Sequence, residues 1–138
     1  MTYSDPGSIL AIQSAIRAEQ NAMYACGLVG AFLSSALARS AVAELAEHQD
    51  RIEFLSSLLN SADVPPTPSA FTQPEPIDSS RSARRAIVTL NNALVSVYAD
   101  AAAVTMAADR TAMVTFAQAS AKTAVEWGSA SQAFPTAS

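Results

Sequence analysis

The stretch ADVPPTPSAFTQPEPIDS, residues 62–79, decides the fold of this 138-residue chain, because it holds five of the seven prolines. Proline removes a backbone donor and clashes with the preceding helical turn, so this stretch cannot be helical. It is also too long for a tight connection between antiparallel helices. In extended form, at about 3 Å per residue, it can run the length of a helical bundle. We therefore predict an ordered strap over residues 62–78 that joins two parallel helices, with Phe71 and Ile77 as its anchors.

Before the strap the sequence is rich in alanine and poor in glycine, which favours long helices. Asp5-Pro6 is typical of a helix start, with a capping residue followed by proline at the first helical position. The helical pattern then continues so far that it needs an internal turn, for which the serine-rich stretch 34–40 is the best candidate. The predicted helices of this half span residues 5–33 and 37–61.

After the strap the pattern repeats. A third helix carries an apolar stripe at helical spacing, formed by Ile87, Leu90, Leu94, Val97, Tyr98 and Val104. Asp109 is a good N-cap for a fourth helix, and Gly128 is a plausible C-cap. The predicted helices of this half span residues 79–108 and 109–128. We expect one all-α domain over residues 1–138, a four-helix bundle with one long crossover between its second and third helices, which is the arrangement of ferritin-like folds.

Two ionisable side chains lie on otherwise apolar helical faces. Glu19 shares its face with Ile12, Ile16, Met23 and Cys26. His48 shares its face with Ala41, Leu45, Ile52 and Leu55. Burying a carboxylate or an imidazole is costly unless the group is paired, hydrogen-bonded or bound to a metal. Glu19 and His48 therefore predict a polar site in the core, or the remains of one.

The full di-iron site of ferritin-like proteins is excluded by the sequence. That site needs a Glu from each of two helices and a Glu-x-x-His pair from each of the other two. The chain has one histidine, and Leu45 stands where the pair would need a glutamate. A faint internal repeat, offset by about 74 residues, aligns Glu19, Glu44 and His48 with Ala93, Gln118 and Lys122.

Three arrangements of the remaining polar residues are open. Glu19, His48 and Glu44 can hold a single metal ion. Alternatively, Lys122 points inward and neutralises Glu19, because a nearby positive charge favours the ionised carboxylate as a metal does. In the third arrangement His48 is hydrogen-bonded to Glu19 or Tyr98, and Lys122 lies outside.

Other residues extend or limit this candidate site. Tyr24 and Tyr98 are interpreted as core aromatics whose hydroxyls reach Glu19 or His48. Cys26 is expected to be a buried, inert thiol. Triad catalysis fits poorly, because there is one histidine, no nucleophile turn and no glycine-rich oxyanion loop.

Bulk composition limits the function classes. The net charge is −4, and the basic residues cluster only at Arg81, Arg84 and Arg85, which argues against nucleic-acid binding. Apolar stretches are interrupted before membrane-spanning length, so no membrane association is expected. A single cysteine forms no intrachain disulfide, and the N-terminus lacks a signal-peptide pattern. We expect a cytoplasmic protein.

Four stretches resemble the actinobacterial ferritin-like family filed as domain of unknown function 4439: AEQNAMYACGLVGA at 18–31, AEHQDRIEFLSSLL at 46–59, DVPPTPSAF at 63–71 and VEW at 125–127. The resemblance covers nearly the whole chain. The family pattern features Glu19 and Tyr24 in the first helix, His48 and Arg51 in the second, and the Pro-Pro strap. The resemblance implies a ferritin-like bundle and no activity, because the family has no assigned one.

Three functions are weighed, and an enzyme is the less expected outcome. The first is a non-catalytic bundle that binds a partner or forms a homodimer, through outer faces carrying Leu28, Phe32, Val88 and Val95. The second is a small-molecule-binding bundle with its pocket in the core around Glu19, Cys26 and His48. The third is a mononuclear-metal or oxidoreductase remnant that uses Glu19 and His48. No cofactor is expected.

Overall fold

The computed structural model describes residues 2–71, 73 and 75–137, with residues 129–137 described by their backbone alone. Four long helices make up the described chain: α1 Pro6–Val29, α2 Ser35–Ser57, α3 Ser80–Val104 and α4 Ala107–Ala137. Two short 3-10 helices, η1 Gly30–Phe32 and η2 Ser61–Asp63, follow α1 and α2. No strand occurs among the described residues, and the all-α prediction is confirmed.

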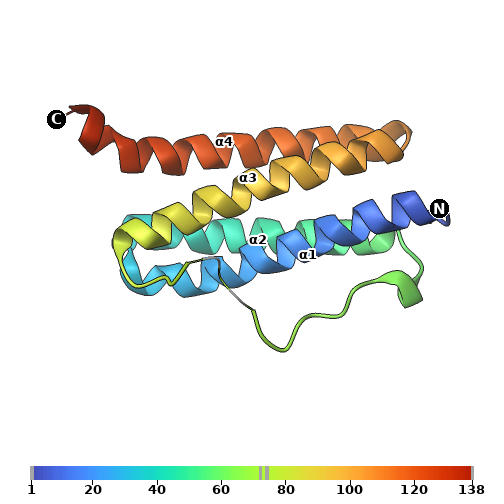
Figure 1. Cartoon of the computed structure of the whole chain (residues 1–138), viewed down its shortest axis with the longest axis horizontal. Coiled ribbons are helices and arrows are strands. Elements are labelled where there is room, and N and C mark those ends of the chain that lie inside the picture. Colours follow the sequence, from blue (N-terminus) through green and yellow to red (C-terminus); the bar gives the residue numbers. More distant parts are fainter. Residues whose placement is uncertain (1, 72, 74, 138) are drawn as a thin grey trace.

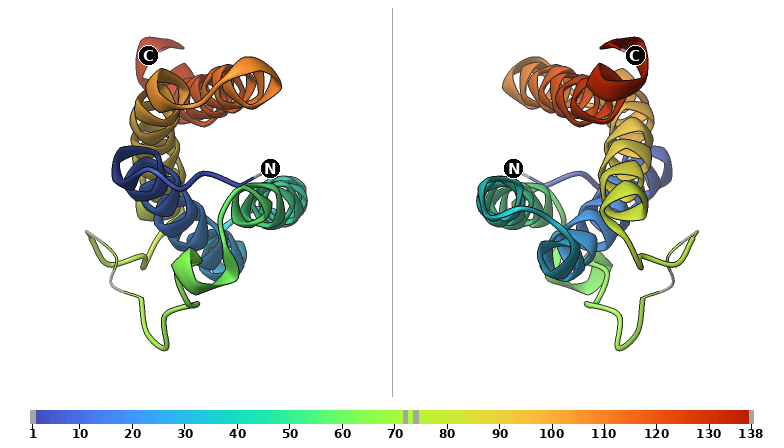
Figure 2. Two further views of the ribbon diagram at one scale, coloured as in Figure 1. Left: turned by 90° about the vertical axis from the view of Figure 1, so that its right-hand side faces the viewer. Right: turned by 90° about the vertical axis from the view of Figure 1, so that its left-hand side faces the viewer.

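The helices form two antiparallel pairs, α1 with α2 and α3 with α4 (Figure 1). The two pairs meet along α1 and α3, which lie side by side in the end views (Figure 2). The strap leads back from the end of α2 to the start of α3, so these two helices run in the same direction (Figure 1). Phe71 of the strap stacks on Tyr24 with ring centroids 4.4 Å apart, and Ile77 packs against an apolar cluster.

Local sequence signals explain where the first three helices begin. The Asp5 carboxylate accepts a hydrogen bond from the Ser8 amide, with Pro6 at the first helical position. Ser34 caps α2 in the same way. Ser79 starts α3 with a reciprocal capping box, in which the Ser82 side chain bonds back to the Ser79 amide.

The predicted limits of the fourth helix are wrong. Helix α4 begins at Ala107, two residues before the expected cap, because the chain turns through extended Thr105 and through Ala107 at φ 50°. Asp109 therefore lies in the first turn, where its carboxylate accepts a hydrogen bond from the Tyr3 hydroxyl at 2.7 Å. Gly128 has no positive φ, the conformation that ends a helix at glycine, and α4 continues to Ala137. The polar tail side chains lie outside the described residues.

Two apolar clusters fill the bundle, and a layer of polar side chains separates them. One cluster includes Ile12, Ile16, Leu55, Leu94, Tyr98 and Met113. The other includes Cys26, Val29, Ala41, Ala83, Ile87 and Trp127. Glu19 and His48 fall between the two clusters along α1 and α2, and both are buried. The core therefore contains a polar layer that must satisfy its own hydrogen bonds.

Helix α3 has the length and mean hydropathy, 1.4 over its best window, that would allow a membrane crossing, so the prediction that every apolar stretch is interrupted before that length is wrong for this helix. Core helices of globular proteins pass the same test. In this fold α3 packs against both α1 and α4, and it carries the buried side chain of Asn91 at mid-helix.

The expected dimer face is only partly open. Leu28 and Phe32 are each 38% exposed. Val88 packs against the second apolar cluster, and Val95 is half-buried. Self-association through this face stays a prediction.

Candidate functional site

Glu19 is the centre of the polar layer. Its side chain is fully buried, and its Oε1 lies 2.6 Å from His48 Nδ1. The Tyr98 hydroxyl donates a hydrogen bond to Oε2, and Arg51 Nη1 lies 3.5 Å from the same oxygen. Both carboxylate oxygens are therefore engaged by the protein's own groups, which is how a buried charge is tolerated.

Arg51 supplies the positive charge next to Glu19. It is 8% exposed, and its guanidinium carbon lies 5.4 Å from the centre of the Phe116 ring. Its Nη1 also donates to the buried Ser120 hydroxyl at 3.5 Å, and Nη2 lies 3.8 Å from Glu47 on the surface. Arg51 thus links α1, α2 and α4 through one side chain.

The structure brings together four of the seven expected site residues, namely Glu19, His48, Arg51 and Tyr98. The expected position of Tyr24 is wrong: it is 37% exposed and stacks on Phe71 of the strap. Tyr24 follows Glu19 by five residues, a rotation of about 140° around the helix, which points it away from the layer.

The inward orientation considered for Lys122 is also wrong. Its side chain is 80% exposed, and its Nζ lies 3.9 Å from Glu126 on the same helix. The inner face of α4 carries Met113, Ser120 and Trp127. Lys122 lies two residues from Ser120, about 200° around the helix, so it faces outward. Of the two arrangements without a metal, the structure has the one in which His48 pairs with Glu19 and Lys122 lies outside.

We therefore expect Lys122→Ala to change the free energy of unfolding by no more than about 0.5 kcal/mol, as for other surface substitutions. A double-mutant cycle with Glu19→Ala, followed by urea denaturation, should show no coupling, because the two side chains do not meet. A coupling above about 0.5 kcal/mol would contradict the outward position of Lys122.

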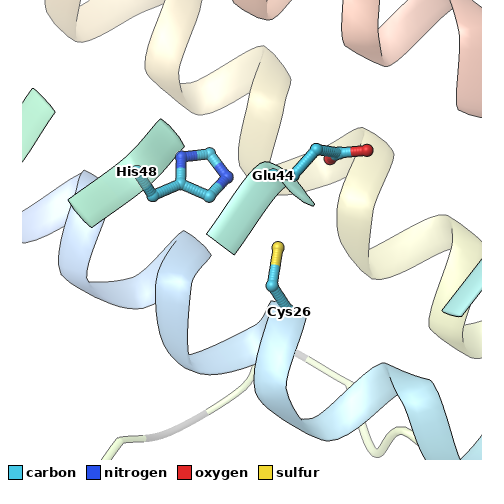
Figure 3. A group of neighbouring side chains, drawn as sticks. All are labelled: Cys26, Glu44 and His48. Carbon is cyan, nitrogen blue, oxygen red and sulfur yellow. The ribbon is translucent and has the colours of Figure 1, made fainter. Parts of the chain in front are cut away.

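Glu44, the seventh expected residue, belongs to a second polar group beside the first. Ligand atoms of Cys26, Glu44 and His48 all lie within 4.8 Å of one another. Figure 3 shows Cys26 on α1 directed toward α2, where Glu44 and His48 occupy successive turns and His48 Nε2 faces the other two residues. Trp127 Nε1 donates to Glu44 Oε2 at 2.6 Å. We call Cys26, Glu44 and His48 the thiol cluster.

Two buried atoms of the thiol cluster have no hydrogen-bond partner within the described part of the chain. They are His48 Nε2, in a residue that is 2% exposed, and Glu44 Oε1. The other polar atom of each side chain is engaged, by Glu19 and Trp127 respectively. Buried polar atoms nearly always have a partner, so these two call for an explanation.

The electrostatics of the thiol cluster favour neutral groups. Burial, with the Glu44 and Glu19 charges adding to it, raises the pKa of the Cys26 thiol to about 12. Burial also raises the pKa of the Glu44 carboxyl, against the hydrogen bond from Trp127 and the charge of His48. Burial and Glu19 raise the pKa of Tyr98, which therefore stays a neutral donor to Glu19.

The order Cys26, His48, Glu19 is also the order of a cysteine nucleophile, its base and an orienting carboxylate. Cys26, however, is 3% exposed, and its high pKa keeps the thiol protonated. The thiolate is the nucleophile, and it needs access to a substrate. The arrangement therefore does not suit nucleophilic catalysis, which agrees with the expectation of a buried thiol.

Sequence reasoning placed Cys26 in the core with Glu19 and His48, but it missed Cys26 as a possible metal ligand beside Glu44 and His48 and it missed the role of Trp127. A signal for the first was present, because Cys26 follows Glu19 by seven residues and Glu44 precedes His48 by four, which places each pair on one helical face. The hydrogen bond between Trp127 and Glu44 joins residues 83 positions apart and has no local sequence signal.

Comparisons with known proteins agree with the all-helical fold. The chain is similar to the crystal structure of a conserved hypothetical protein, rv2844, from Mycobacterium tuberculosis, with a TM-score of 0.82 and 22% identity over 91% of this chain and 98% of that chain. At this identity the likeness shows the fold alone. No curated protein matches the chain. The model of the family described as domain of unknown function (DUF4439) matches residues 11–138, and the chain therefore belongs to that family.

Proposed function

We propose that the chain is a ferritin-like bundle that has given up di-iron oxidoreductase chemistry and acts as a binding protein, with its ligand in the core. The observation that carries this proposal is that both oxygens of Glu19 are engaged by the protein's own donors. A carboxylate that bridges or binds iron needs those oxygens for the metal. Arg51 supplies the positive charge that a metal would supply.

The long strap between the parallel helices α2 and α3 supports the ferritin-like part of the proposal, because one long crossover is typical of such bundles. The second half of the chain supports the loss of the metal chemistry. Among its residues whose side chains the structure describes, the buried polar ones are Asn91, Thr105 and Ser120, together with the hydroxyl of Tyr98. None of these is a carboxylate or an imidazole, so the residues present do not fit a di-iron centre.

The thiol cluster supports the binding part of the proposal. His48 Nε2 and Glu44 Oε1 are buried and have no partners among the described residues, and ligand atoms of the two side chains lie within 4.8 Å of each other. An unsatisfied buried polar atom costs about 1–3 kcal/mol, and a bound ligand would recover that cost. A small ligand between α1 and α2 is therefore the use that best accounts for the geometry.

The test is oxidation of ferrous iron in air by the purified full chain. We expect a rate no higher than that of buffer, because Glu19 is not available to iron. Native mass spectrometry of the same sample should show a mass above that of the denatured chain, from the bound ligand. Oxidation well above the buffer rate that Glu19→Gln abolishes, and the matched surface change Glu53→Gln does not, would overturn the proposal.

A further inference from the structure

We propose that the thiol cluster binds one divalent metal ion of the zinc type through Cys26 Sγ, Glu44 and His48 Nε2. This inference rests on the proposed function, since it names the ligand of the core. It gives both unpartnered atoms a role, because each would coordinate the ion. It also differs from the expected Glu19–His48 site, in which Glu19 would be a ligand.

The donor set suits zinc. Zinc takes sulfur, imidazole nitrogen and carboxylate oxygen together, at bond lengths of about 2.0–2.3 Å in a tetrahedron. Such a tetrahedron places its ligand atoms about 3.3–3.8 Å apart. In the structure these atoms lie within 4.8 Å of one another, so the largest separation has to shorten by about 1–1.5 Å when an ion binds. Three protein ligands leave the fourth position for a water molecule.

The surrounding polar layer has the form of an outer coordination sphere. A metal-binding histidine almost always donates its other ring N–H to a carboxylate, a backbone carbonyl or a water molecule, which orients the ring and fixes the tautomer. Glu19 makes that contact with His48 Nδ1 at 2.6 Å, leaving Nε2 for the ion. Trp127 holds Glu44 in the same manner through Oε2. Arg51 and Tyr98 in turn hold Glu19, so α1, α2, α3 and α4 all contribute to the support.

Charge balance favours a divalent ion at this depth. A thiolate and a carboxylate together carry two negative charges, and a neutral imidazole adds none. A divalent cation therefore makes the site electrically neutral, next to the Glu19–Arg51 pair, which is neutral as well. On binding, the metal–sulfur bond replaces the S–H bond of Cys26 and one proton leaves to solvent, with no change of oxidation state. Zinc has no redox chemistry, which agrees with the proposed non-redox function.

The experiment is a titration of the chelator-treated full chain with cobalt(II), a spectroscopic probe for zinc sites. We expect saturation at one equivalent, the near-ultraviolet absorption of a cobalt–thiolate bond and the strong visible bands of a tetrahedral centre. One equivalent of zinc should then displace the cobalt, because zinc binds such sites more tightly. The wild-type spectrum alone tests the ligand set, so no variant has to fold for the test to work.

Variants assign the ligands one by one. Cys26→Ser should abolish the thiolate band, and Glu44→Gln, which keeps an oxygen for Trp127, should weaken binding without removing that band. Cys26→Ser and Glu44→Gln should each lower the affinity for cobalt by more than the 10–100-fold typical of a change in the outer coordination sphere. Trp127→Phe changes only that outer sphere and should lower the affinity by 10–100-fold. The control is Glu53→Gln on the exposed face of the same helix, which should bind as the wild type does. Circular dichroism checks that each variant is folded at the titration temperature.

Three outcomes would overturn the inference: no binding by the wild type, a saturated cobalt spectrum without the thiolate band, or affinity unchanged in both Cys26→Ser and Glu44→Gln.

The iron-oxidation test separates failure of the zinc site from failure of the proposed function. A chain that binds zinc and also oxidises iron refutes the non-redox proposal and leaves the zinc site standing. A chain that does neither refutes the zinc site alone.

Discussion

Glu19→Ala is expected to lower the free energy of unfolding by about 3–5 kcal/mol, the range for removing one partner from a buried ion pair. The substitution removes the buried counter-charge of the Arg51 guanidinium, which is 8% exposed and keeps the surface carboxylate of Glu47 at 3.8 Å. It also removes the acceptor of the Tyr98 hydroxyl and the partner of His48 Nδ1. The measurement is urea denaturation followed by circular dichroism and by the fluorescence of the single tryptophan, Trp127.

Two comparisons isolate the charge from the packing. Glu19→Gln keeps an oxygen acceptor and nearly the same volume, so its loss should be smaller than that of Glu19→Ala. Glu53→Ala removes a glutamate from the surface of α2 and should cost no more than about 0.5 kcal/mol. If Glu19→Ala unfolded at the wild-type urea concentration, Glu19 would not be the centre of a buried network.

His48→Ala should lower the free energy of unfolding by about 2–4 kcal/mol, from lost packing and from an unpaired Glu19 oxygen. The His48 side chain is 3% exposed and lies between the two apolar clusters. Thermal and urea unfolding measure the effect in chelator-treated protein, so that metal loss does not contribute. A transition indistinguishable from the wild type would show that His48 is not in the core.

The same variant separates the two roles of His48, which are the contact with Glu19 and the proposed bond to zinc. In a double-mutant cycle with Glu19→Ala the coupling should be about 0.5–3 kcal/mol, because the two groups are 2.6 Å apart. Added zinc at 100 times its dissociation constant should stabilise the wild type by about 2.7 kcal/mol and His48→Ala by far less. Equal stabilisation of both proteins would place the zinc elsewhere.

Local signals in the sequence predicted much of the fold because they act within a few residues. Several prolines close together exclude a helix, and this predicted the strap. Asp5-Pro6 caps a helix through atoms three residues apart, and α1 begins there. The apolar residues that share a helical face with Glu19 and with His48 predicted that both are buried. A helix that packs its apolar face into the core also buries the other residues of that face. These inferences needed no knowledge of neighbouring helices.

Which residues meet across helices depended on the rotation of each helix about its axis. The repeat-based alignment placed Lys122 opposite the polar layer, whereas α4 turns Ser120 and Trp127 inward and leaves Lys122 in solvent. The predicted core position of Tyr24 is wrong because Tyr24 lies about 140° around α1 from Glu19, and its ring stacks on Phe71 of the strap. The start of α4 depended on a single residue, Ala107, in a conformation that sequence propensity does not favour.

The sequence by itself determined an all-α chain, a proline-rich strap that separates two helical pairs, and a buried glutamate and histidine on facing helices. These follow from hydrophobic spacing and backbone restriction, which are properties of neighbouring residues. Only the tertiary structure decided that Arg51 neutralises Glu19 and that Cys26 and Glu44 approach the free nitrogen of His48. The physical reason is that close approach across helices depends on how all four helices pack together. Rotating a helix about its axis by about 100°, the angle between successive residues, moves a side chain from the core to solvent.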